Sequence, residues 1–204
     1  TKIAKFISIV FHPTFQATFL TFILYSSVPE LFRPFDDSSF PRLLLFVAVL
    51  TCLFPLMLIL GLRALGTISS LNMPTRQERL MPFFFISLFY GLTVYFFSQR
   101  LAMNDMIVVM LIAVTILIFL IFLITIKFKI SVHAAASWGV FGCLLSLNTQ
   151  LPDSPLLYPF IGSVLLAGLV SSARLYLNAH TPKEVYYGLV LGFAVCFGIL
   201  YFAF

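Results

Sequence analysis

Residues that could act on a phosphate group lie in three polar junctions between long apolar segments. These residues are, in chain order, Arg76, Arg79, Ser131, His133, Arg174, His180 and Glu184. Guanidinium groups bind phosphate oxygens through paired hydrogen bonds. A phosphoryl group in transfer carries charge on its equatorial oxygens, so positioning and positive charge supply most of the catalysis. This set of side chains therefore predicts chemistry on a phosphate ester.

The two histidines of this set could share the work of cleaving such an ester. A neutral imidazole can attack phosphorus, and a protonated imidazole can give its proton to the leaving oxygen. His180 lies directly before an expected helix start, where backbone amides and the helix dipole favour an anion. His133 lies at the mouth of an apolar segment, two residues after Ser131. We expect both imidazoles to face one phosphate.

Glu184 has two candidate roles. Thr181, Pro182 and Glu184 form the pattern of a capping box, with threonine at the N-cap and proline at the first helical position. The same carboxylate could instead orient the ring of His180. The sequence leaves both interpretations open.

The elements that must position these residues are apolar segments of membrane-spanning length. The 204 residues are 61% hydrophobic and 9% charged, whereas a soluble domain carries about 25% charged residues. We therefore expect an all-α, polytopic integral membrane protein, folded as a single domain over residues 1–204. Its expected spans are 3–28, 41–66, 80–98, 106–127, 133–149, 156–177 and 184–204. Pro13 could break the first span, and six spans with a re-entrant or tilted segment are the alternative to seven.

The three predicted active-site segments are 72–82, 129–134 and 173–184. Pairs of spans separate them, so all three should open at one membrane face. Nine of the 12 Lys and Arg residues lie on that side, which favours a cytoplasmic site. This charge bias includes the three candidate arginines themselves.

Composition and spacing argue against several other classes of protein. The basic residues are dispersed, so we expect no nucleic-acid partner. The three cysteines lie singly in apolar segments, which argues against a disulfide framework or a zinc site. Asp36 and Asp37 form a single acidic pair on the opposite side, so the acidic motifs of a prenyltransferase are missing. The first apolar segment is too long for a cleavable signal peptide.

The third junction resembles the third signature of the type 2 phosphatidic acid phosphatases, the lipid phosphate phosphatases related to vanadium haloperoxidases. That signature reads Ser-Arg-x5-His-x3-Asp. Here Arg174, His180 and Glu184 keep the spacing, while Ala173 replaces the serine and glutamate replaces the aspartate.

The other two junctions are more divergent from this family. "ISVH" ending at His133 is similar to the second signature, Pro-Ser-Gly-His, through Ser131 and His133. "RQERLMP" ending at Pro82 keeps two cationic residues and the proline of the first signature, Lys-x6-Arg-Pro, without its spacing. The resemblance runs from residue 72 to residue 184, and the chain is similar to membrane forms from Bacteroidetes.

The resemblance implies a role for each candidate residue. His180 would be the nucleophile that forms a phosphohistidine, Glu184 would orient it, and His133 would be the general acid. Phosphate would be held by the remaining residues of the set, Arg174, Ser131, Arg76 and Arg79, with the last two interchangeable. The family implies no metal or other cofactor.

The implied substrate is a membrane lipid with a phosphate or pyrophosphate headgroup, in a bacterial inner membrane. One alternative is a lipid phosphotransferase that uses the same histidine chemistry. Another is a non-enzymatic lipid-binding or transport protein with a degenerate phosphate pocket. His12 lies outside the matching segments, and we expect it to be a helix-kink or packing residue.

Overall fold

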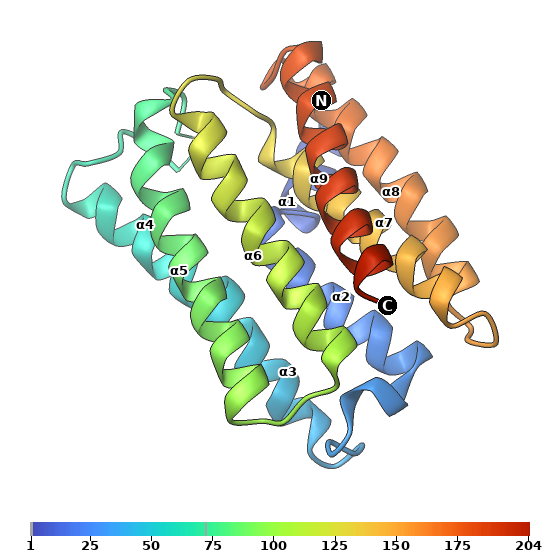
Figure 1. Ribbon diagram of the computed structural model, residues 1–204. Helices are drawn as coiled ribbons and strands as arrows, with labels where there is room; N and C mark the ends of the chain where they lie inside the picture. The colour runs from blue at the N-terminus through green and yellow to red at the C-terminus, as the bar shows by residue number, and fades with distance from the viewer. Residues whose placement is uncertain (1, 72) are drawn as a thin grey trace.

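The computed structural model describes residues 2–71 and 73–204, and across these it contains helices and no strand (Figure 1). Thr1 and Asn72 lie outside the described residues, and Asn72 is the first residue of the predicted segment 72–82. The α-helices are α1 (Lys2–Val10), α2 (Pro13–Ser27), α3 (Phe40–Ala48), α4 (Phe54–Ala64), α5 (Gln77–Gln99), α6 (Asp105–Thr125), α7 (Val132–Gln150), α8 (Leu157–Tyr176) and α9 (Pro182–Ala203). The expected all-α fold is confirmed.

Several of these helices can cross a membrane. The helix Phe40–Ala64, which joins α3 and α4 through a π-helical turn at Val49–Leu53, is long and apolar enough, as are α5, α6, α8 and α9. The pair α1 and α2 meets the same criterion if it is one span bent by 62°. The break falls at Pro13, which has no backbone N–H to continue the hydrogen-bond ladder of α1. The protein is therefore an integral membrane protein, and α1 and α2 form either one broken span or a re-entrant segment.

Helix α7 occupies the expected fifth span but is less apolar than its neighbours, and it does not meet the spanning criterion. It packs against α9 along most of its length and also against α8 and α2. Its buried face is rich in small residues, including Ala134, Ala135 and Gly139. Small residues allow two helix backbones to approach closely, so the composition of α7 suits contact with protein more than contact with lipid.

Glycines on α9 make this close approach possible. A Cβ atom on Gly188 would lie 2.6 Å from the backbone oxygen of Ser131, and one on Gly192 would overlap the backbone oxygen of Ala135. The two glycines thus hold α9 directly against the first turns of α7. Those turns carry Ser131 and His133, so this contact positions one predicted active-site segment beside another.

The three predicted active-site segments meet at one end of the bundle. The connections from α4 to α5, from α6 to α7 and from α8 to α9 all lie at the top of Figure 1, and those from α2 to α3, from α5 to α6 and from α7 to α8 lie at the opposite end. A hydrogen bond ties two of the three together, because the backbone N–H of Ser131 donates to the backbone oxygen of Glu184 at 3.1 Å.

Candidate active site

A cavity with a volume of about 270 Å³ opens at this end of the bundle. Polar side chains from five helices or their termini line its outer part: His12, Arg79, His133, Arg174 and His180. Four of these belong to the set predicted from the sequence. The structure therefore brings together residues that are more than 100 positions apart in the chain.

The turn between α8 and α9 places His180 at the edge of this cavity. Asn178 has a φ of +50°, a left-handed conformation that asparagine tolerates better than most residues and that commonly ends a helix. Pro182 then starts α9, and Thr181 caps it by accepting a hydrogen bond from the backbone N–H of Glu184 at 3.3 Å. His180 is left just before the helix start, with 8% of its surface exposed.

Glu184 performs both of the roles that the sequence left open. Its Oε2 atom lies 2.6 Å from Nδ1 of His180 and also accepts a hydrogen bond from the backbone N–H of Thr181 at 3.3 Å. The capping box and the imidazole contact therefore share one carboxylate oxygen. Because a carboxylate accepts, Nδ1 of His180 carries the proton, and Nε2 keeps its lone pair.

The surroundings of His180 favour its neutral form. Burial is the main cause that lowers the pKa of His180 from 6.5 to about 4, and the charges of Arg79 and Arg174 lower it further. The hydrogen bond that His180 donates to Glu184 opposes this shift. At neutral pH the ring is uncharged, which is the state required of a nucleophile.

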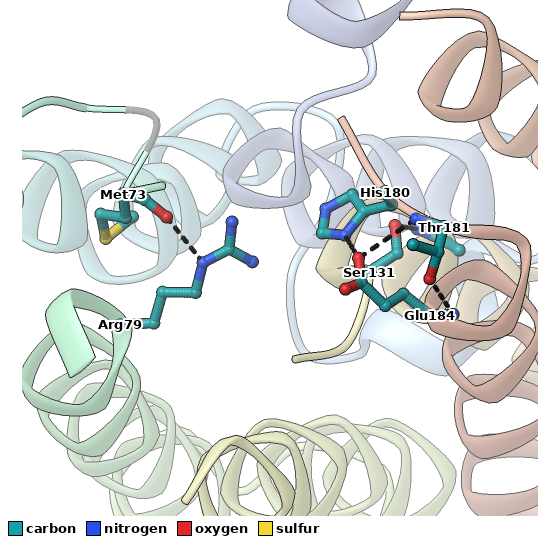
Figure 2. Close-up of polar contacts among 7 residues, drawn as sticks. Met73, Arg79, Ser131, His180, Thr181 and Glu184 are labelled. Atoms are coloured by element: carbon teal, nitrogen blue, oxygen red, sulfur yellow. Dashed lines mark hydrogen bonds and ion pairs between the residues drawn. The ribbon is translucent and has the colours of Figure 1, made fainter. Parts of the chain in front are cut away.

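Two arginines approach the cavity from different helices. Arg79 is 8% exposed, and its Nε donates to the backbone oxygen of Met73 at 2.9 Å, which fixes the direction of the guanidinium. Figure 2 shows this guanidinium directed towards the ring of His180, with Glu184 on another side of the ring. Arg174 lines the same cavity, and its buried Nε has no hydrogen-bond partner within the described part of the chain. Both are placed to receive an anion.

Arg76 takes a different position from Arg79. It is the residue before the first turn of α5, is only half-buried and does not line the cavity. The three-residue spacing does not bring both side chains to the site, because Arg76 precedes the helix in which Arg79 is buried. Of the two arginines that the sequence left interchangeable, the geometry favours Arg79.

Replacing Arg79 with alanine is expected to lower kcat/KM for phosphate release by about 100-fold or more, because a preorganised positive charge would be removed from the transferring phosphate. Arg76→Ala is the matched control, since it removes the same charge outside the cavity and should leave kcat/KM within about twofold. Initial rates for both purified variants would measure the difference. Equal losses in the two variants would contradict the assignment of Arg79.

Ser131 and His133 face different surroundings although they are two residues apart. The hydroxyl of Ser131 accepts a hydrogen bond from the backbone N–H of Ala134 at 3.4 Å and so caps α7. Ser131 is fully buried and is not among the residues that line the cavity. The ring of His133 does line it, and its Nε2 lies 3.2 Å from the backbone oxygen of Ser8.

His12 is the cavity residue that sequence reasoning did not place in the site. Its ring centroid lies 5.0 Å from that of His133, and the two planes are nearly perpendicular. The one available signal was an ionisable residue inside an apolar span, which is a reason to suspect function. His12 was nevertheless not assigned to the site, because it is far in sequence from the three junctions.

Comparison with known protein families supports the same class of protein. The family model of the PAP2 superfamily matches residues 122–204. This match covers the C-terminal part of the chain and confirms the resemblance to the type 2 phosphatidic acid phosphatases seen in the sequence there. Searches of curated proteins and of solved structures gave no significant match.

Members of this superfamily are phosphatases that act on phosphate esters. The matched region contains His133, Arg174, His180 and Glu184, whereas Arg79 and His12 lie outside it. The site is thus built from the matched C-terminal helices and from additional walls supplied by the first half of the chain.

Proposed function

We propose that this protein is a metal-independent membrane phosphatase that hydrolyses a lipid phosphate or pyrophosphate through a phosphohistidine. One observation supports the proposal above all others. A single cavity joins a cationic and imidazole-lined end to an apolar interior. Such a cavity matches a molecule with an anionic headgroup and a hydrocarbon chain.

The apolar part of the cavity runs deep into the bundle. Along α7, the residues that line it extend from His133 through Ala136 and Val140 to Cys143. At 1.5 Å per helical residue this is a depth of about 15 Å. The surrounding walls come from α2, α4, α5 and α6, through side chains that include Leu20, Ile59, Phe83 and Ile121. An alkyl or prenyl chain would exchange lipid for a similarly apolar environment there.

The phosphate end fits a two-step transfer. Nε2 of His180 attacks phosphorus, the bond from phosphorus to the lipid oxygen breaks, and protonated His133 gives its proton to that oxygen. Water then attacks the phosphohistidine while neutral His133 accepts a proton from it. Inorganic phosphate leaves and His180 is restored. Arg79 and Arg174 stabilise the phosphoryl oxygens in both steps, and Glu184 holds the reactive ring.

We also infer that the protein lies in a bacterial inner membrane with this site on the cytoplasmic face. The excess of Lys and Arg on the side of the three junctions supports the orientation, and the similarity to membrane forms from Bacteroidetes supports the bacterial inner membrane.

The substrate class can be tested by measuring phosphate release from several compounds in detergent. Phosphatidate, phosphatidylglycerol phosphate and polyprenyl pyrophosphate are expected to have kcat/KM values at least about 100-fold above that of glycerol 3-phosphate, because only they fill the apolar cavity. Vanadate, a mimic of pentavalent phosphorus, should inhibit.

Val140→Phe provides a matched control for this experiment, because it adds bulk to the apolar wall away from the imidazoles. It should reduce turnover of the long-chain substrates and leave slow hydrolysis of glycerol 3-phosphate unchanged. Equal efficiency of the wild-type protein on short and long substrates would contradict the lipid assignment.

A further inference from the structure

The break between α1 and α2 introduces His12 into the cavity from outside the region matched by the family. The chain turns by 62° at this break, and His12, which lies within the break, lines the cavity. Its Nδ1 lies 3.4 Å from the backbone N–H of Thr14 and 2.9 Å from the hydroxyl of Thr14. A backbone N–H can only donate, so Nδ1 accepts and the neutral ring carries its proton on Nε2. The capping contact therefore fixes both the direction and the tautomer of this ring.

His133 is contacted twice by the same bent segment. The backbone oxygen of Ser8, in α1, lies 3.2 Å from Nε2 of His133. A carbonyl oxygen only accepts, so Nε2 carries a hydrogen and Nδ1 is the nitrogen left to exchange a proton with a substrate. The ring of His12 then lies edge to face with the ring of His133, at 5.0 Å and 89°. One contact fixes a nitrogen and the other fixes the plane of the ring.

We propose that His12 is a positioning residue for the general acid, and that the bent segment α1–α2 holds His133 in the orientation that protonates the leaving oxygen. The inference rests on the proposed function. A side chain that delivers a proton must be held within hydrogen-bond reach of its target, and small misplacements are costly. This role differs from packing because its loss should slow protonation of the leaving oxygen and spare the attack of His180 on phosphorus.

Two substitutions separate the capping role of His12 from its ring contact. His12→Asn keeps a side-chain acceptor for the amide of Thr14 and removes the ring. His12→Phe keeps an aromatic ring against His133 and removes the cap. Each variant would be assayed on an alkyl phosphate, whose leaving oxygen needs a proton, and on p-nitrophenyl phosphate, whose leaving group is stable as an anion.

His12→Asn is expected to lower kcat on the alkyl phosphate by about 10-fold or more and to leave p-nitrophenyl phosphate within about twofold. His12→Phe, which keeps a ring against His133, should retain more activity on the alkyl phosphate than His12→Asn does. His133→Ala should show the same selective loss in a stronger form.

The remaining outcomes each have a definite meaning. A His12→Asn variant equal to wild type on both substrates, or equally impaired on both, would overturn the positioning role alone. A His180→Ala variant that retained wild-type turnover would overturn the proposed function, and this inference with it.

Discussion

Replacing His180 with alanine is expected to reduce phosphate release by about 10⁴-fold or more, because under the proposed mechanism the substitution removes the atom that would form the covalent bond to phosphorus. The expected size follows from the position of the ring. Its Nε2 is unprotonated at neutral pH, and the guanidinium of Arg79 is directed towards it. Initial rates with a lipid phosphate in detergent micelles would measure the loss.

His180→Asn is the matched control for this experiment. The asparagine amide can still donate a hydrogen bond to Glu184, so the capping box at the start of α9 and the local fold should be retained. Its thermal unfolding midpoint should stay close to that of the wild type while its activity is lost. Covalent labelling supplies a second readout, since phosphate should be trapped on the wild-type chain and on neither variant. Turnover at the wild-type rate in His180→Asn would exclude His180 as the nucleophile.

Gly192→Ala is expected to lower the free energy of unfolding by about 3 kcal/mol or more, although the added group is a single methyl. The new Cβ would overlap the backbone oxygen, carbonyl carbon and Cα of Ala135, and none of these can rotate away. Helices α7 and α9 would have to separate, which would also move the two histidines of the site. Unfolding by heat or by denaturing detergent would measure the change.

Gly198→Ala is the control, because it makes the same substitution on the same helix. A Cβ at position 198 meets no atom within 4 Å. Alanine has the higher helix propensity, so this variant should be as stable as the wild type or more stable by up to about 1 kcal/mol. A similar loss of stability in both variants would show that helix propensity, and not the approach of α7 to α9, determines the result.

The sequence was sufficient to predict the helices of the fold, because segments that cross lipid must be long and apolar. Long apolar segments predict helices, and the predicted spans agree with the observed helices to within a few residues at most ends. The break expected at Pro13 agrees with the 62° bend between α1 and α2, which fits either a broken span or a re-entrant segment. The number of spans was harder to determine, because α7 is covered by other helices and so lacks the uniform hydropathy of a lipid-facing segment.

The candidate site was predictable where its residues lie close together in sequence. The four-residue spacing that places His180 just before α9 and Glu184 in its first turn leads directly to their hydrogen bond. The choice between Arg76 and Arg79 depends on where α5 begins, and the burial of Ser131 depends on the approach of α9. His12 reaches the cavity only through the bend between α1 and α2. Such tertiary features leave little trace in local sequence patterns.

The modest hydropathy of α7 has a consequence for biogenesis. Insertion by the translocation machinery depends on how well each segment partitions into lipid, and the buried face of α7 carries glycine, alanine and serine where it packs against its neighbours. Helix α9 is synthesised after α7, so the helix against which α7 packs most extensively is absent when α7 first meets the membrane. Stable insertion of α7 in the bilayer should be completed only after α9 has been inserted, so the candidate active site should form late in synthesis of the chain.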